Sequence, residues 1–347
     1  MLPPALEVLD LKKHFVTRKT LLGKPDRVVR AVDGVSFHVA RGQTLGVVGE
    51  SGCGKSTTAR LLMHLIEPDA GRIRLHGREY GNVGGLKPVS ELRQRMQMVF
   101  QDSYASLNPR LTIEDSIAFG PRIQGQSRSE SRQLARDLLD QVGLNPDSFI
   151  RRYPHELSGG QRQRVNIARA LAMKPEIMVL DEAVSALDKS VQAQVLNLLS
   201  DLKRDFELTY LFISHDLNVV QYISDHVVVM YLGQVVEFGP VAQIYEQPAH
   251  PYTRALLDAV PAQTPNSRKA HTVLEGDPPN PIDPPAGCRF HPRCPFAEPI
   301  CAEREPVPVR VRPEQESACH MVAPQSGHSR HLTMIPLTST LPEEAVA

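Results

Sequence analysis

The chain has 347 residues, of which 41% are apolar and 22% charged, a composition typical of a globular protein with about two domains. Its formal net charge is zero, which argues against binding nucleic acid through a broad basic surface. The longest apolar runs, such as residues 227–232, are far shorter than the ~20 residues of a membrane helix, and the first residues lack a signal-peptide pattern. We therefore expect a cytosolic protein, in which disulfides are rare.

The first informative segment, LGVVGESGCGKSTTARLL at residues 45–62, predicts a buried strand, a glycine-rich loop and a helix. Gly49 and Gly54 frame the pattern G-x-x-x-x-G-K-S, in which backbone N–H groups curl around phosphate oxygens. Lys55 adds a positive charge, the Ser56 hydroxyl can bind Mg²⁺, and the helix directs its positive N-terminus at the same anion. The sequence therefore predicts binding of ATP or GTP. The expected nucleotide-binding residues of this loop are Gly49, Glu50, Ser51, Gly52, Cys53, Gly54, Lys55, Ser56 and Thr57.

A second glycine-rich segment consists of Ser158, Gly159 and Gly160, and it precedes a stretch with apolar residues at helical spacing. A serine and glycines at a helix N-terminus can form another anion site, although an ordinary helix cap explains these three residues better when they are taken alone. One nucleotide needs one phosphate cradle. We therefore interpret the second cradle as serving an ATP molecule that another subunit holds.

Two later apolar segments end in polar side chains. Residues 177–182, IMVLDE, predict a buried strand that ends in Asp181 and Glu182. Asp181 can hold Mg²⁺ through water, and Glu182 can polarise an attacking water as general base. Residues 210–216, YLFISHD, predict another buried strand, and His215 at its exit could contact the γ-phosphate of ATP. Each of these side chains alone is more often structural, so their interpretation depends on the whole set.

In this order the motifs resemble those of the nucleotide-binding subunit of an ABC transporter, over roughly residues 5–320. The resemblance implies an α/β fold, namely a P-loop NTPase ABC cassette with a RecA-like core, an antiparallel β subdomain and a helical subdomain at about residues 104–153. In that subdomain, apolar residues at helical spacing predict one buried helix face. These residues are Leu134, Leu138, Leu139 and Val142.

The resemblance also implies roles for single residues. Phe15 would stack on adenine, Glu182 would be the general base, and His215 would sense the γ-phosphate. The Q-loop, centred on Gln101, would link the site to the helical subdomain. The expected ligands of Mg²⁺ are Ser56, Gln101 and Asp181.

Two such subunits would close head to tail around two ATP molecules, so that each P-loop, residues 49–57, faces the partner's signature segment, residues 157–161. Ala183 stands where the family usually has proline, and Lys189 is also less usual, but neither change removes a catalytic group. We therefore expect a competent ATPase. The residues expected to face the partner's ATP are Ser158, Gly159, Gly160 and Gln161 of the signature and Asp188 of the D-loop.

Longer strings, at residues 31–57, 96–110 and 250–261, resemble the oligopeptide/dipeptide importer branch. Within that branch they are most similar to the second ATPase subunit, the oligopeptide-F or dipeptide-F type. The partners implied are a D-type ATPase, two transmembrane permease subunits and an extracytoplasmic peptide-binding protein, with no nucleic acid. The chain would act at the cytoplasmic face of the bacterial inner membrane. Two alternatives stay open: an importer of nickel, glutathione or another solute, and a soluble ABC ATPase of DNA repair or translation. The second alternative predicts two cassettes in one chain, or a long coiled-coil or zinc-binding insertion between Gly54 and Leu157. The interval between these two residues is too short for such an insertion.

Proline is dense between residues 240 and 313, which disfavours long helices and central strands. We therefore expect a nucleotide-binding domain at residues 1–250, an irregular C-terminal extension at 251–322 and a flexible tail at 323–347. Four of the 5 cysteines lie in the extension. They are Cys288, Cys294, Cys301 and Cys319.

The family resemblance implies that these four cysteines ligate a [4Fe–4S] cluster. Their spacing lacks the C-x₂-C pairs typical of structural zinc, although a zinc site of three cysteines with His291 or His320 stays open. Four incidental thiols are the remaining alternative. In a proline-rich segment with little core, a bound metal group would also contribute folding free energy.

Overall fold

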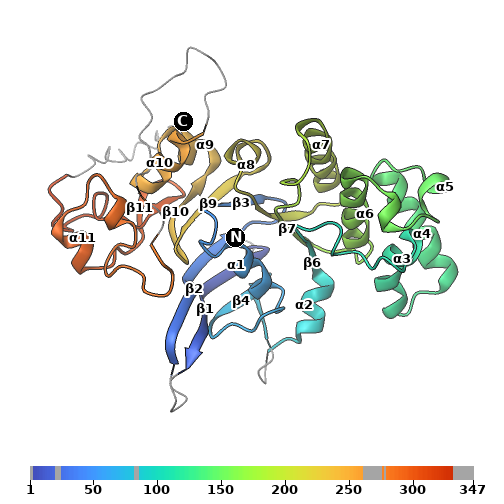
Figure 1. Cartoon of the computed structure of the whole chain (residues 1–347), viewed down its shortest axis with the longest axis horizontal. Coiled ribbons are helices and arrows are strands. Elements are labelled where there is room, and N and C mark those ends of the chain that lie inside the picture. The colour runs from blue at the N-terminus through green and yellow to red at the C-terminus, as the bar shows by residue number, and fades with distance from the viewer. Residues whose placement is uncertain (1–2, 20–24, 82–85, 261–275, 277–278, 331–347) are drawn as a thin grey trace, which may run out of the picture.

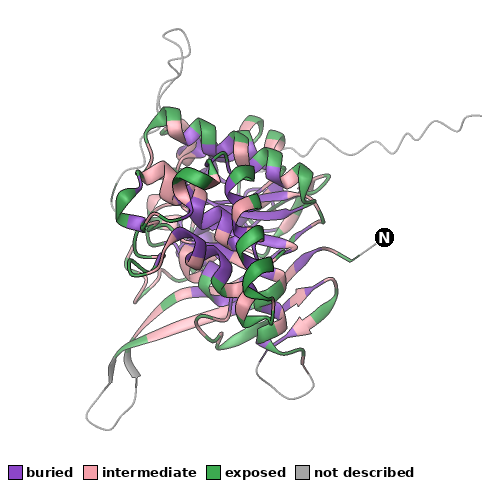
Figure 2. Ribbon diagram, turned by 90° about the vertical axis from the view of Figure 1, so that its right-hand side faces the viewer, coloured by how far each residue is buried: buried purple, intermediate pink, exposed green. Residues whose placement is uncertain are grey.

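The computed structural model of the chain describes residues 3–19, 25–81, 86–260, 276 and 279–330. An eight-stranded sheet occupies the centre of the molecule, and a four-stranded sheet lies below it in Figure 1. The helices of residues 113–171 gather at one end, and the C-terminal extension gathers at the other. Figure 2 shows the buried residues concentrated in the central strands and the exposed residues on the outer faces of the helices.

The large sheet is built from β3 (Thr44–Val48), β6 (Met96–Val99), β7 (Ile177–Asp181), β8 (Thr209–Ile213), β9 (His226–Tyr231), β10 (Gln234–Pro240), β11 (Val309–Arg312) and β12 (Gln315–Ser317). Their order across the sheet is β11-β12-β10-β9-β3-β8-β7-β6. The strands from β9 to β6 pair in parallel, and the pairs at the other edge are antiparallel. Every residue of β3, β7 and β8 is buried, as expected for parallel strands that are covered on both faces.

The large sheet separates two hydrophobic cores, because successive side chains of a strand point to opposite faces. Leu180 and Phe212 enter the core that the helices cover. Val179 and Ile213, their neighbours in sequence, enter the core shared with the small sheet. Because both faces are packed, the register of the central strands is fixed, and so is the position of each strand's last residue at the edge of the sheet.

The small sheet has the antiparallel order β2-β1-β4-β5. Its strands are β1 (Leu6–Lys19), β2 (Pro25–Val39), β4 (Ala70–Leu75) and β5 (Arg78–Tyr80). Two helices connect strands of the two sheets along the chain: α1 (Lys55–Leu62) runs from β3 to β4, and α2 (Val89–Arg95) runs from β5 to β6. Leu61 and Leu62 of α1 and Leu92 of α2 are fully buried in the shared core.

The helical end of the molecule consists of α3 (Ile113–Ile123), α4 (Arg128–Gln141), α5 (Pro146–Phe149), a 3₁₀ turn η1 (Pro154–Glu156) and α6 (Gly159–Leu171). Ser127 begins α4 with a capping box, in which its hydroxyl accepts from the Glu130 N–H and the Glu130 side chain accepts from the Ser127 N–H. Leu138 and Leu139 are buried and Leu134 packs against the same core, on the helix face that the sequence predicts.

Three further helices cover the opposite side of the large sheet from the small one (Figure 1). They are α7 (Lys189–Asp205), α8 (Leu217–Ile223) and α9 (Val241–Glu246). Val195, Leu199 and Leu202 of α7 lie on one helix face and are buried in the helix-covered core.

The extension is more regular than its proline content indicates. It contains α10 (Pro251–Asp258), a 3₁₀ turn η3 (His291–Arg293), α11 (Pro299–Glu303) and the strands β11 and β12. β12 pairs with β10, so the extension completes one edge of the large sheet. Glu237 of β10 is buried at this joint, where its carboxylate accepts hydrogen bonds from the Ala249 and His250 N–H groups and from the Gln315 side chain.

The expected tail begins within the described residues, because residues 323–330 pack against the extension. Ser326 and His328 are buried there, and the His328 ring bonds the Phe296 carbonyl oxygen at 2.9 Å. Residues 331–347 of the expected tail lie outside the described residues. In the part of the chain that is described, no helix combines the length and apolar character that crossing a membrane requires.

Candidate functional site

The glycine-rich loop follows β3 and leads directly into α1. Gly49 and Gly54 have positive φ angles of 149° and 107°, and Gly54 is the N-cap of α1. A Cβ atom at Gly49 would lie 2.2 Å from the Met230 carbonyl oxygen, and one at Gly54 would lie 2.3 Å from that of Ala31. Only glycine therefore fits at either end of the loop, and the backbone N–H groups between them can face a phosphate group.

Lys55 is the first residue of α1, and its side chain is almost fully buried. Its ammonium group donates hydrogen bonds to the carbonyl oxygens of Gly49 at 2.7 Å and Glu50 at 3.0 Å. The ammonium group is thus held within the curve of the loop. This places a positive charge beside the N–H groups that can bind phosphate.

Two oxygen groups suitable for Mg²⁺ meet where α1 begins and β7 ends. The Ser56 hydroxyl donates to Asp181 Oδ1 at 2.9 Å, and Asp181 is buried. Burial raises the pKa of the Asp181 carboxyl; the hydrogen bond from Ser56 opposes this rise and the neighbouring Glu182 adds to it. Hydroxyl and carboxylate oxygens are the donors that Mg²⁺ prefers, so the residue types here fit a magnesium site.

Glu182 follows β7 and is the point at which two other expected site residues meet. Gln101 follows β6, and its Nε2 donates to Glu182 Oε2 at 2.8 Å. His215 follows β8, and its Nδ1 lies 3.3 Å from Glu182 Oε1. Because β6, β7 and β8 are adjacent parallel strands, their carboxyl ends bring these three side chains together.

The signature residues cap α6. Ser158 Oγ accepts from the Gln161 N–H at 3.3 Å, and Gln161 Oε1 accepts from the Ser158 N–H at 3.0 Å. A Cβ atom at Gly160 would lie 2.4 Å from a methyl group of Val191, so the helix start packs tightly on α7. In the described part of the chain, the hydrogen bonds of this cap join Ser158 and Gln161 and do not reach the P-loop.

The two remaining expected site residues lie at the start of α7 and on β1. Asp188 is the N-cap of α7, where its carboxylate accepts from the Val191 N–H at 3.0 Å. Phe15 is half-buried on β1 opposite Val29 of β2, and the Lys13 ammonium lies 5.7 Å from its ring centre.

Sequence reasoning missed the contacts between the extension and the P-loop. The Glu50 N–H donates to the hydroxyl of Tyr252, and the Glu50 carboxylate binds the Arg293 guanidinium. Arg293 lies beside Cys294 in the cysteine-rich segment, residues 287–301, and this position was the local signal that could have drawn attention to it.

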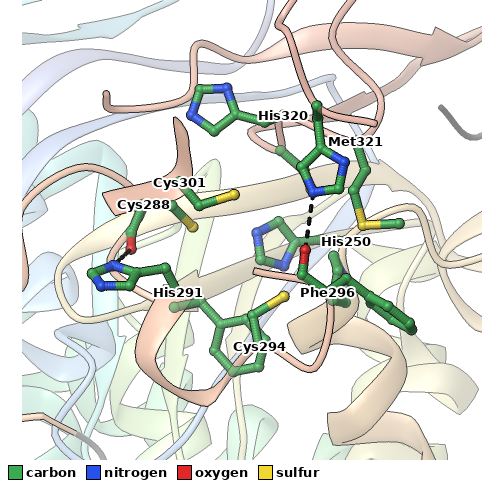
Figure 3. Close-up of a pocket in the computed structure, with 12 residues that line it drawn as sticks. His250, Cys288, His291, Cys294, Phe296, Cys301, His320 and Met321 are labelled. Carbon is green, nitrogen blue, oxygen red and sulfur yellow. Dashed lines mark hydrogen bonds between the residues drawn. The ribbon is translucent and has the colours of Figure 1, made fainter. Parts of the chain in front are cut away.

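The four cysteines of the extension line one small cavity together with buried histidines (Figure 3). The sulfur atoms of Cys288, Cys294 and Cys301 turn toward a common space, with His250 at its border. Burial raises the pKa of Cys288 to about 11 and that of Cys319 to about 12, and the neighbouring thiols add to both shifts. As the described residues stand, no group of three or more His, Cys, Asp or Glu side chains is placed to hold a metal ion.

Comparisons with known proteins identify the family of the chain. Residues 32–185 match the family described as ABC transporter, and residues 236–301 match the family described as oligopeptide/dipeptide transporter, C-terminal region. The oligopeptide transport ATP-binding protein AppF of Bacillus subtilis (strain 168) is 49% identical over 91% of this chain and 97% of its own length. The di/tripeptide transport ATP-binding protein DppF of Pseudomonas aeruginosa (strain UCBPP-PA14) is 48% identical over the same shares of the two chains.

Among solved structures, CbiO1 from Clostridium perfringens, part of the ABC transporter complex CbiONQ, superposes with a TM-score of 0.60 at 25% identity. The match covers 71% of this chain and 92% of that structure. The two matched families, the close relatives and the shared fold agree with one another. The chain belongs to the family of ABC transporter ATP-binding subunits, in the oligopeptide/dipeptide branch.

Proposed function

We propose that this chain hydrolyses ATP to power a bacterial importer of di- or oligopeptides. The observation that carries the proposal is the convergence of Gln101 and His215 on Glu182, beside the P-loop and the Ser56–Asp181 pair. The names of the relatives supply the substrate class, since they describe oligopeptide and di/tripeptide transport. The chain works at the cytoplasmic face of the inner membrane.

Each group at the site has a distinct part in hydrolysis. The loop N–H groups and Lys55 bind the phosphates, and Phe15 stacks on the adenine base. Ser56, Gln101 and Asp181 would hold Mg²⁺, which would neutralise charge on the phosphates. Glu182 accepts a proton from the attacking water, and His215 contacts the γ-phosphate.

The proposed assembly contains a second, D-type ATPase subunit, two permease subunits and an extracytoplasmic peptide-binding protein. Ser158 to Gln161 and Asp188 face the ATP that the second ATPase holds. The helices within residues 104–153 form a subdomain that seats the membrane partner. Phe119 and Ile123 support this role, because they lie on α3 and are 58% and 71% exposed, as expected for apolar residues at an interface.

Uptake by cells that carry the whole operon tests the proposal. The variants are Glu182→Gln and, as a matched control, Glu246→Gln on the exposed face of α9. The solutes are labelled di-, tri- and pentapeptides, glutathione and nickel. We expect the first variant to abolish peptide uptake and the control to retain it. If only the uptake of glutathione or nickel is lost, that solute is the substrate of the importer. Unchanged uptake of every solute would favour the soluble ATPase.

We also propose that the four cysteines of the extension ligate an iron–sulfur cluster. Their shared cavity supports this proposal, since four thiols around one space are the donor set of such clusters. The space is small, ≈ 10 Å³, or about one water molecule, and the described side chains are not placed to hold a metal ion as they stand, so the thiols would have to move to bind a cluster. Ligation also requires the thiols to lose their protons, which their raised pKa values oppose at neutral pH.

Anaerobic purification followed by iron, sulfide and zinc assays tests this cluster. We expect iron and sulfide in wild-type protein and in Cys53→Ser, because Cys53 lies in the P-loop and outside the cavity. We expect neither in Cys288→Ser. Zinc without sulfide would instead favour a site of three cysteines with His291 or His320. Folded protein without metal would show that the four cysteines are free thiols.

A further inference from the structure

We propose that Arg293 is a positioning residue of the ATP site, which holds the second residue of the P-loop, Glu50, and thereby couples ATP affinity to the cysteine-rich segment. The inference rests on the proposed ATP site. It adds a contact from the extension that the nucleotide-binding motifs do not contain.

Arg293 and Glu50 form a bidentate salt bridge. Arg293 Nη1 donates to Glu50 Oε2 at 2.8 Å, and Nη2 donates to Oε1 at 3.0 Å. The Arg293 side chain is 6% exposed and that of Glu50 is 22% exposed. Two parallel bonds between planar groups fix direction as well as distance, and burial limits the competition from water.

The environment of Arg293 holds the guanidinium in place. The hydroxyl of Tyr231 accepts from Arg293 Nη1 at 3.3 Å, and the guanidinium lies 6.0 Å from the centre of the Tyr231 ring. An arginine guanidinium is charged at every physiological pH. Arg293 is therefore a fixed charged anchor for the loop.

The extension contacts Glu50 at a second point. The Glu50 N–H donates to the Tyr252 hydroxyl at 2.9 Å, and the Glu50 carbonyl accepts from the Lys55 ammonium. Arg293 and Tyr252 thus hold the side chain and the backbone of the residue that helps to position Lys55. A loop that is already ordered loses less conformational entropy when it binds a ligand, so this support should increase ATP affinity.

The same segment joins Arg293 to the cysteine cavity. Arg293 ends η3 and directly precedes Cys294. Arg289 directly follows Cys288 and is also buried, and its guanidinium binds the Leu232 carbonyl and the Asp33 carboxylate of β2. Between the two arginines, Phe290 is fully buried against the rings of Tyr231 and Tyr252. This short, well-packed segment therefore connects the cysteine cavity to the nucleotide-binding region through its two arginines.

A double-mutant cycle in the complete purified transporter tests the coupling. The variants are Arg293→Gln, Glu50→Gln and the double variant, with Arg310→Gln on the exposed face of β11 as matched control. The readouts are the KM for ATP, kcat at saturating ATP, the Kd for ATP by displacement of a fluorescent ATP analogue, and the thermal unfolding midpoint.

We expect each single variant to raise KM and Kd by about tenfold, the effect of losing a charged hydrogen bond, while kcat changes by less than about twofold. The double variant should resemble the single variants, because both remove the same bridge. Arg310→Gln should match wild-type protein. Arg293→Lys keeps the charge but loses the two-point geometry, and it should show an intermediate KM.

Unchanged KM and Kd in Arg293→Gln would overturn the inference, even if the unfolding midpoint fell, because the bridge would then be structural only. Effects that multiply in the double variant would also overturn it, since the two residues would act separately. If Arg293→Gln fails to fold, Arg293→Lys with wild-type KM has the same meaning. Wild-type protein that binds no ATP would remove the proposed ATP site, and with it this inference.

Discussion

At the scale of single residues, Glu182 shows how the backbone serves the site. Its φ angle of 48° lies in the left-handed region, which non-glycine residues rarely adopt. Its N–H donates to the Ile213 carbonyl at 3.0 Å, and its own carbonyl accepts from the Ser185 hydroxyl at 2.9 Å. Because the surrounding structure holds this strained conformation, the carboxylate is directed at Gln101 and His215.

The substitution Glu182→Gln keeps the size of the side chain and removes the base. We expect ATP hydrolysis by the purified complex to fall by about 10²–10⁴-fold, the usual contribution of a general base, with little change in the Kd for ATP. Steady-state hydrolysis and equilibrium binding measure the two effects separately. A variant with near wild-type hydrolysis would show that another group accepts the proton.

At the scale of elements, α4 and α6 begin with the same capping arrangement. Ser127 accepts from the Glu130 N–H at 3.2 Å, and Ser158 accepts from the Gln161 N–H at 3.3 Å. The two caps therefore make comparable contributions to helix stability. Only the cap of α6 is proposed to face a nucleotide.

This similarity gives a matched pair of variants, Ser158→Ala and Ser127→Ala. Each should lower the free energy of unfolding by about 0.5–2 kcal/mol, the usual cost of losing a serine cap. Urea unfolding of the chain measures this effect. Only Ser158→Ala should also slow ATP hydrolysis in the complex that contains both ATPase subunits, and equal hydrolysis by the two variants would argue that Ser158 is an ordinary cap.

The strands of the large sheet show what the sequence could predict. The strands β7 and β8 are continuous apolar runs that end in polar residues, so both the strands and the residues at their ends could be located from local pattern. β12 carries only Gln315, Glu316 and Ser317, which have no strand pattern, and it forms because the edge of β10 offers backbone partners. The bridge between Glu50 and Arg293 joins segments 243 residues apart, and no local periodicity encodes such a contact.

At the scale of the whole molecule, Asp33 connects the extension to the small sheet. It accepts hydrogen bonds from His14 of β1 at 2.9 Å and from Arg289 of the extension. Burial raises the pKa of Asp33, but the hydrogen bonds from His14 and Arg289 outweigh it, and the pKa lies below its ordinary value of 3.8. Asp33 is therefore more acidic in the folded protein than in the unfolded chain.

A lowered carboxyl pKa contributes stability above the unfolded value and loses that contribution as the pH falls through the folded value. We expect the unfolding midpoint of wild-type protein to fall more steeply below a pH of about 5 than that of Asp33→Asn. Asp140→Asn, exposed on α4, should retain the wild-type slope. Thermal unfolding across the acid range measures the three slopes, and parallel curves for wild-type protein and Asp33→Asn would contradict the role of this contact.

The pairing of β12 with β10 also has a consequence during synthesis. β10 is complete at Pro240, but its outer partner, Gln315–Ser317, leaves the ribosome much later. Until then, β10 presents unpaired N–H and C=O groups at the edge of a sheet, where another chain can add as a strand. The nascent cassette is thus exposed to aggregation until its own extension covers that edge.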